Sequence, residues 1–534
     1  MTDLALFRAD LVGMTLASVL AVALWFAPGV ILARGMARLA PAGGSWQPWA
    51  PALAFTLLPL LGSLAIRLGG VGLAAALHLA LAAAALVAAR ADLPRPGRAA
   101  LIAIGAWWLY MTLIYVDVDL GGQLYQSLPI FDLVKHAIIV REIDAHGLPL
   151  RDPFFLRSEP AGYYHFFYGS AAVIDRLGGA LVDARMAFCG LAFATGIALA
   201  ATVRALAIES GLINAAERGA ARVIALLCAI GGFDLFGVWL RWRLNGTILP
   251  NSERWDDEIS LLPTSASWVP HHLSAAIAAF VALAALNRAL GEQDRRARLA
   301  LAALAGAAMA AAFGLSVWVT LGAAAALAAA LLAVPRSQRV SWIGLTAAAG
   351  VVAMVLSLPQ LAEVLQGRGG QPFPLGLWLR DHAKLGALTG QGLSPLAWLA
   401  AVPLVWLLEF GALAIGTSLF WRSADLPRRT TLERILVAST VTGLALNLFV
   451  RSTIINNDFG WRVAWFAALP MMVWTLAVLL KPGLGRGAKV ALGIAIACGL
   501  VSTLFSASVT DILSGYRVMS RALVKLVRLR AGGF

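Results

Sequence analysis

The stretch from 130 to 155, IFDLVKHAIIVREIDAHGLPLRDPFF, concentrates side chains that can hold or transfer charge. Asp132 stands near its start, and Lys135 and His136 follow within about one helical turn. A carboxylate or an imidazole in such a setting can remove a proton from a hydroxyl, and a neighbouring cation can stabilise negative charge on a phosphate. The run is therefore a candidate site for acid–base chemistry.

The chain around this run is strongly apolar. It has 534 residues, of which 60% are hydrophobic and only 13% are charged, with a net charge of +14. Such a composition predicts an all-α, polytopic membrane protein that spans a lipid bilayer. The positive charge is typical of cytoplasmic loops, so it does not indicate a nucleic-acid partner.

Apolar runs predict about 14 transmembrane helices. Arg-rich loops between them predict which side is cytoplasmic, and the opposite side then carries every histidine except His78. We expect outer loops at 117–183, 241–271, 359–393 and 451–461, and a multi-pass protein of the bacterial inner membrane with its polar site facing the periplasm. The predicted spans are 11–33, 48–66, 70–89, 99–116, 184–207, 219–240, 272–290, 298–313, 315–334, 340–358, 394–419, 432–450, 462–480 and 487–509.

Two amphipathic juxtamembrane helices are predicted in the first outer loop. The first runs from Ile130 to Ile143, with Phe131, Val134 and Ile138 on its apolar face and Gly147 ending it. The second begins at the aromatic sequence YYHFFYGSAAVIDRL. Asp132 at the start of the first helix has a simpler alternative role, that of an N-cap.

The order of these pieces resembles that of GT-C-fold glycosyltransferases. The resemblance rests on an Asp opening a juxtamembrane helix, the sequence IVRE, a Gly that ends the helix, an RDPFF turn and then GYYHFFYG. Members of that family transfer a sugar from a polyprenyl-phosphate carrier to a lipid or glycan acceptor at the outer face. The resemblance implies a catalytic core at 99–340, with accessory spans at 1–98, further spans at 341–510 and a basic amphipathic tail at 511–534. The tail would lie outside, so it either rests on anionic lipid or indicates that one predicted span is wrong.

The resemblance implies that Asp132 is the catalytic carboxylate, and we add His136 as a second candidate. The family often has Asp-Glu at this point, whereas this chain has Asp132-Leu133. Asp117, Asp119 or Asp152 could supply the second acid. No cofactor is certain. A divalent cation such as Mg²⁺ or Mn²⁺ is one option, for which the acids at 254–260 are either ligands or a solvated loop.

Cations and amides that could hold the donor phosphate lie in later outer segments. Arg462 follows Asn457 and Asp458 at a helix start, and an Arg fork fits a phosphate. Alternatively, Arg462 is an anchor whose charged end reaches the membrane surface, and Asn457 or Asp458 caps the helix. The other candidate phosphate ligands are Arg451, His271 and His272. Two adjacent histidines point in different directions on a helix, so one metal ion would rarely take both.

Tyr163, Tyr164 and His165 are candidates for a sugar or acceptor subsite, or else interfacial anchors. Three other functions remain open. A transporter or flippase of lipid-linked glycans would carry charges within several spans or paired broken helices, and Glu409 is one charge within a span. A polymerase or ligase would have its large outer loop later in the chain. A non-catalytic membrane scaffold would explain the incomplete acid pair.

Overall fold

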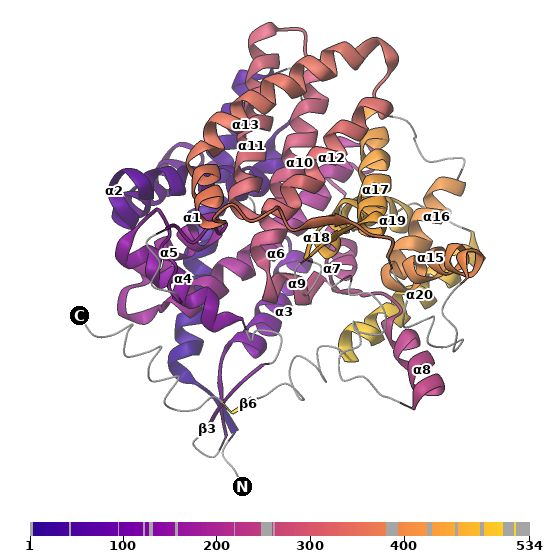
Figure 1. Ribbon diagram of the computed structural model, residues 1–534, viewed down its shortest axis with the longest axis horizontal. Helices are drawn as coiled ribbons and strands as arrows, with labels where there is room; N and C mark the ends of the chain where they lie inside the picture. The colour runs from indigo at the N-terminus through magenta and orange to yellow at the C-terminus, as the bar shows by residue number, and fades with distance from the viewer. Residues whose placement is uncertain are drawn as a thin grey trace.

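The chain forms an all-helical bundle with short strands at its rim (Figure 1). The computed structural model describes residues 4–41, 44–93, 95–120, 123–127, 132–154, 159–217, 219–246, 259, 262–380, 394–423, 430–453, 458–480, 485–505 and 517–518. Its helices are α1 Arg8–Leu39, α2 Ala50–Ala88, α3 Arg98–Tyr115, α4 Leu133–His146, α5 Phe166–Gly178, α6 Ala184–Glu209, α7 Ala220–Ala229, α8 Asp234–Asn245, α9 Leu262–Trp268, α10 Pro270–Gly291, α11 Arg295–Leu315, α12 Val317–Ala333, α13 Arg339–Gly367, α15 Pro395–Phe410, α16 Ala412–Arg422, α17 Thr431–Phe449, α18 Asp458–Val463, α19 Trp465–Leu480 and α20 Arg486–Phe505.

The described residues contain 11 helices that are long and apolar enough to cross a membrane, or up to 12 if a bent pair is counted as one span. This confirms an all-α, multi-pass membrane protein but does not reproduce the 14 predicted spans. The predicted spans 48–66 and 70–89 are the two arms of α2, which is kinked where Gly69 and Gly70 take non-helical backbone angles. The predicted break within 298–334 is present, because Ser316 ends α11 and caps α12.

Small residues allow the N-terminal helices to approach closely. A Cβ atom on Gly29 of α1 would lie 2.2 Å from the carbonyl oxygen of Ala50, and one on Gly190 of α6 would lie 2.4 Å from the backbone of Ala17. Side chains of any size are excluded at both crossings, as at small-residue contacts of other membrane helices. These contacts fix α1 against α2 and α6, and α6 in turn packs against α4 and α5.

The C-terminal part departs from the predicted single span at 394–419. α15 and α16 meet at 106° across Gly411, which has φ +49°. Gly231 and Gly232 lie in a second break, between α7 and α8, and the amide of Phe233 donates to the carbonyl oxygen of Leu408 over 2.5 Å. Two broken helices therefore contact each other at their breaks, a feature that the hydropathy pattern did not reveal.

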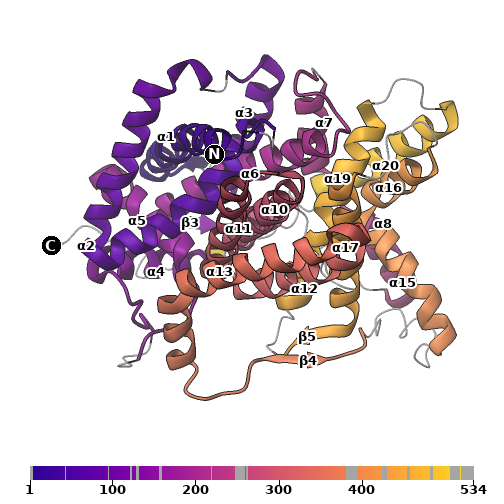
Figure 2. The ribbon, with the colours of Figure 1, turned by 90° about the horizontal axis from the view of Figure 1, so that it is seen from above.

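The strands form two small antiparallel sheets among the described residues. The first has the order β1-β2-β3-β6 and the second pairs β4 with β5. Figure 2 shows β4 and β5 side by side at the rim of the bundle. The predicted basic helical tail at 511–534 lies outside the described residues, apart from β6. The strands are β1 Leu4–Leu6, β2 Val118–Leu120, β3 Gln123–Gln126, β4 Leu375–Leu377, β5 Val450–Ser452 and β6 Arg517–Val518.

Candidate functional site

One pocket gathers residues from segments that are far apart in the sequence. It encloses about 370 Å³ between the start of α4, the loop before α5, the junction of α9 and α10, the start of α12, the end of α13 and α18. Its volume lies within the range usual for small-molecule sites. Its lining residues are Asp132, Lys135, His136, Gly162, Tyr163, Tyr164, Trp268, Val269, His271, His272, Val317, Trp318, Val364, Arg368, Phe373, Pro374, Asp458 and Arg462.

Asp132 holds the N-cap position of α4, but its side chain makes no capping hydrogen bond. Its Oδ2 atom is instead 3.0 Å from Lys135 Nζ and accepts a hydrogen bond of 3.2 Å from Trp268 Nε1. The side chain of Asp132 remains 24% exposed. The Asp132 side chain therefore does not cap α4, and its carboxylate is turned toward the pocket.

Asp458 is the other carboxylate among the described lining residues. It lies one helical turn before Arg462 on α18, and its Oδ1 is 3.5 Å from Arg462 Nη2. Arg462 is only 2% exposed, and its guanidinium lies 5.6 Å from the ring centres of both Trp268 and Trp461. Arg462 is therefore held in the protein interior beside the pocket, which does not fit a snorkelling anchor.

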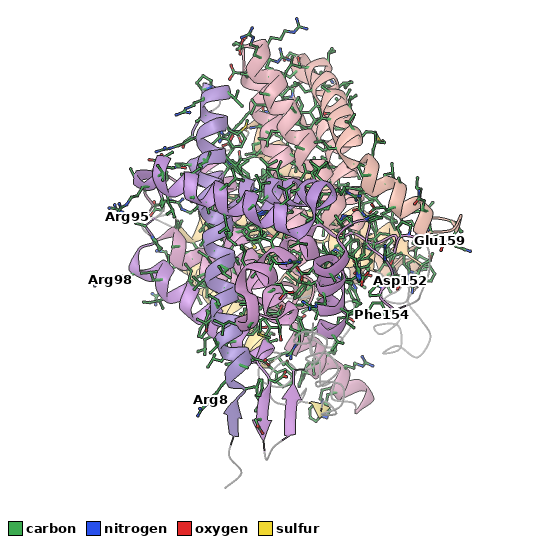
Figure 3. The ribbon with its side chains drawn as sticks, turned by 90° about the vertical axis from the view of Figure 1, so that its left-hand side faces the viewer. Arg8, Arg95, Arg98, Asp152, Phe154 and Glu159 are labelled. Atoms are coloured by element: carbon green, nitrogen blue, oxygen red, sulfur yellow. The ribbon has the colours of Figure 1, made fainter. Side chains whose placement is uncertain are left out.

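None of the three acids predicted as partners of Asp132 lines the pocket. Asp117 is buried against Arg185, with Oδ1 2.9 Å from Nη2. Asp119 belongs to β2, and Asp152 accepts a hydrogen bond of 2.9 Å from the Phe154 amide. Figure 3 shows Asp152, Phe154 and Glu159 together at one edge of the bundle, away from Arg95 and Arg98. The pocket therefore brings Asp458, and none of the three predicted acids, together with Asp132.

Three histidines form the floor of the pocket. His136, His271 and His272 are each at most 2% exposed, and the ring centres of His271 and His272 are 4.1 Å apart. His136 Nδ1 pairs with the Tyr168 hydroxyl at 2.9 Å, and His272 Nδ1 with Ser316 Oγ at 2.6 Å. We refer to His136, His271 and His272 as the histidine floor.

The environment of His136 makes it a weak base. Desolvation by burial, followed by the nearby Lys135 charge, lowers the pKa of His136 to about 3. The sequence placed this residue away from the apolar face of its helix, yet α5 and α6 cover it and its ring stacks on Phe188 at 4.6 Å. His136 is therefore neutral near pH 7, and Asp132 is the better candidate for proton removal.

Tyr163 and Tyr164 stack on each other with ring centres 4.1 Å apart at the pocket wall. They precede α5, which begins at Phe166, so the predicted start of the second helix was three residues too early. Gly162 has φ +61°, and a Cβ atom on it would lie 3.1 Å from the Cα of Gly367. The Tyr163 carbonyl accepts a hydrogen bond of 2.9 Å from Gln360. The end of α13 thus fixes the tyrosine loop.

His165, predicted beside the two tyrosines in a sugar subsite, lies outside the pocket. It is fully buried, with Nε2 3.3 Å from Ser63 Oγ and Nδ1 3.7 Å from Glu363, which pairs with Arg67 at 2.5 Å. Burial, and then the Arg67 charge, lowers the pKa of His165 to about 3. This histidine is buried next to the tyrosine loop and does not line the pocket.

The remaining predicted residues fall elsewhere. Arg451 lies on β5 with its guanidinium 4.8 Å from the ring centre of Trp378, and it does not line the pocket. Asn457 and the acids at 256–258 lie outside the described residues. Within the described part of the chain there is no group of three or more His, Cys, Asp or Glu side chains arranged to hold a metal ion.

Several lining residues were not predicted. Lys135 was visible as part of the polar run, whereas Gly162, Trp268 and Arg368 had no distinguishing pattern. Burial alone would lower the pKa of the Lys135 ammonium, but Tyr163, Asp132 and Asp458 raise it, so this cation stays charged. Lys135, Arg368 and Arg462 line the pocket together with Asp132 and Asp458, which leaves it with one excess positive charge.

No protein-family model matches the chain, and no curated protein matches it. The pocket must therefore be interpreted from its own chemistry.

Proposed function

We propose that the chain is a membrane glycosyltransferase that transfers a sugar from a polyprenyl-phosphate carrier to a hydroxyl acceptor. One observation carries the proposal: a carboxylate that does not cap its helix shares a pocket with buried and half-buried cations, in a protein whose other helices are suited to lipid. A lipid-linked phosphate would bring the negative charge that this pocket lacks.

In the proposed reaction Asp132 is the general base. The acceptor oxygen attacks the anomeric carbon and loses its proton to the Asp132 carboxylate, while the bond from that carbon to the phosphate oxygen breaks. The electron pair of that bond stays on the phosphate. Lys135 and Arg462 stabilise the charge that develops there, with Lys135 Nζ already 3.0 Å from Asp132 Oδ2.

Asp132→Asn tests this reaction in the purified, reconstituted protein. Asparagine keeps the size and the hydrogen-bond acceptor of the side chain but cannot take the proton. We expect transfer of labelled glucose from decaprenyl-phosphate glucose to a hydroxyl acceptor to fall by roughly a hundredfold or more, the usual contribution of a general base.

The matched control is Asp152→Asn, which changes an acid of the same outer loop that lies outside the pocket. This variant should transfer sugar at the unmodified rate. Equal rates for Asp132→Asn and the unmodified protein would exclude Asp132 as the base.

Transport of lipid-linked glycans is a second candidate, favoured by the two broken helices. A Cβ atom on Gly232 would lie 2.4 Å from the Glu409 carbonyl oxygen, and the buried Glu409 side chain accepts a hydrogen bond of 3.3 Å from the Ile259 amide. Broken helices beside an intramembrane carboxylate are common in transporters. A transporter would move decaprenyl-phosphate glucose across proteoliposomes without any acceptor and would not depend on the base at Asp132.

A further inference from the structure

Trp268 contacts both a carboxylate and a buried cation of the pocket. It is the last residue of α9, and α10 begins two residues later at Pro270. Its indole Nε1 donates a hydrogen bond of 3.2 Å to Asp132 Oδ2, while its ring centre lies 5.6 Å from the guanidinium of Arg462. One side chain therefore contacts the proposed base through its N–H and the proposed phosphate cation through its ring.

The backbone around Trp268 is held in place by neighbouring groups. The Val269 amide donates to the carbonyl oxygen of Ser265 over 2.9 Å. The buried hydroxyl of Tyr115, at the end of α3, donates to the carbonyl oxygen of Ser267. Helix α9 also packs against α6. A side chain on such a supported backbone can orient the groups that it contacts.

The donors around Asp132 fall on one of its two carboxylate oxygens. Oδ2 is 3.0 Å from Lys135 Nζ and 3.2 Å from Trp268 Nε1. Within the described part of the chain, Oδ1 accepts no hydrogen bond. An ionised carboxylate has about four lone-pair sites. Two donors on Oδ2 thus leave Oδ1 as the oxygen with room to take a proton from an acceptor hydroxyl.

The contact with Arg462 gives the indole a second effect. A guanidinium is attracted to the face of a tryptophan ring at this distance. Trp461, which precedes Arg462 on α18, also has its ring centre 5.9 Å from that of Trp268. Asp132 and Arg462 form no ion pair with each other, although both are among the described residues. The indole, which contacts both, therefore ties the position of one to that of the other.

We infer that Trp268 is a positioning residue of the proposed reaction: its N–H, together with Lys135, holds Asp132 Oδ2 so that Oδ1 takes the proton of the acceptor hydroxyl. The acceptor oxygen bonds to the anomeric carbon, and the electron pair of the bond that breaks stays on the phosphate. The ring of Trp268 keeps Arg462 where that charge develops. This inference rests on the proposed function and deepens it, because it assigns the oxygen that is protonated and the residue that orients it.

Trp268→Phe tests the role of the N–H, since it keeps an aromatic ring and removes the donor. Transfer of labelled glucose from decaprenyl-phosphate glucose is measured per folded molecule in the reconstituted protein. We expect kcat to fall roughly tenfold to hundredfold, the effect of one hydrogen bond to a charged group. KM for the carrier should stay within about threefold, because a ring remains beside Arg462.

Trp268→Leu removes the ring together with the N–H. It should lower kcat as Trp268→Phe does, and it should also weaken binding of bare decaprenyl phosphate roughly threefold to tenfold in a titration, because Arg462 loses a ring contact. A general loss of structure would instead impair kcat and carrier binding together in both variants.

The matched control is Trp107→Phe. Trp107 is also half-buried, and its Nε1 donates a hydrogen bond of 3.0 Å to the carbonyl oxygen of Phe193, but it lies on α3 and does not line the pocket. Its kcat and KM should equal those of the unmodified protein.

The outcomes separate the two proposals. If the unmodified protein transfers no sugar, the proposed function fails and the inference fails with it. If Asp132→Asn lowers transfer while folded Trp268→Phe keeps the unmodified kcat, the inference fails and the proposed function stands. A rise in KM without a fall in kcat would give Trp268 a part in binding alone and would equally overturn the inference.

Discussion

Two clusters in this protein each combine carboxylates with cations, and they differ in how completely the charges are enclosed. In the cluster of Asp10, Asp117 and Arg185, every side chain is at most 3% exposed, and the guanidinium contacts both oxygens of Asp117 at 2.9 Å and 3.3 Å. We call it the closed cluster. Around the pocket, Asp132 and Lys135 are 24% and 38% exposed.

The comparison shows why composition alone does not locate a site. Both clusters contain an Asp in or near the segment 117–183, and both contain an Arg in a helix that follows. In the closed cluster the charges contact one another where β2 begins, and the Asp117 carbonyl also accepts a hydrogen bond from the Phe7 amide. In the pocket the same residue types leave charge and space for a ligand.

The largest expected effect comes from breaking the closed cluster. Arg185→Met would leave Asp10 and Asp117 buried without their cation, which costs about 3–5 kcal/mol in comparable buried pairs. We expect a lower thermal unfolding midpoint and a lower yield of folded protein in detergent. Turnover per folded molecule should remain unchanged, because none of the three residues lines the pocket.

The control for this prediction is the triple variant Asp10→Asn, Asp117→Asn, Arg185→Met. Removing all three charges avoids the unpaired carboxylates, so it should recover much of the lost stability. A loss of turnover in folded Arg185→Met protein would contradict the distinction between the two clusters.

A second prediction concerns the phosphate subsite. Arg462→Ala removes a buried cation, and we expect binding of decaprenyl phosphate to weaken roughly tenfold to hundredfold, the effect of a charge-assisted hydrogen bond. Arg462→Lys keeps a point charge without the planar fork and should lose less. Titration of the purified variants with the bare carrier measures both.

Arg451→Ala is the matched control, since Arg451 is a cation close to Arg462 in the sequence that stacks on Trp378 and does not line the pocket. Its carrier affinity should equal that of the unmodified protein. Normal affinity in both Arg462 variants would make Arg462 a structural residue held between two tryptophans.

Much of the fold could be predicted from the sequence, because long apolar runs and Gly or Pro breaks have local causes. The helix at α4 and its end at Gly147 follow from periodicity and from a residue with φ +73°. The bend at Gly411 could not be predicted, since glycine is common within apolar helices and only contact with the second break fixes the angle. The sequence also predicted the wrong buried face for α4, because packing against α5 and α6, which are distant contacts, decides which of its side chains are buried.

For the site, the sequence identified residue types but not their partners. One pocket is lined by Asp132, Tyr163, Tyr164, His271, His272, Asp458 and Arg462, which come from segments far apart in the sequence. That Asp458, and not Asp117, shares the pocket with Asp132 depends on contacts between distant segments. The catalytic and binding roles of these residues remain predictions.

The smallest expected effect concerns acid sensitivity and again contrasts the two clusters. His136 has a pKa of about 3 in the folded protein, below its ordinary value of 6.5, because burial and Lys135 oppose its charge. The unfolded chain therefore binds more protons between these two values, so stability is fully present above about pH 6.5 and falls as the pH is lowered toward 3. When the pH is lowered from 7.5 to 5.5, proton uptake by this histidine in the unfolded chain should lower the free energy of unfolding by about 1.4 kcal/mol, the equivalent of one pKa unit.

His136→Phe should give a flatter profile of thermal midpoint against pH than the unmodified protein, whatever its midpoint at neutral pH. The triple variant Asp10→Asn, Asp117→Asn, Arg185→Met should leave the slope in this range unaltered, because it changes no histidine and leaves no buried carboxylate without Arg185. An unchanged slope in His136→Phe would show that His136 is not held neutral by the pocket.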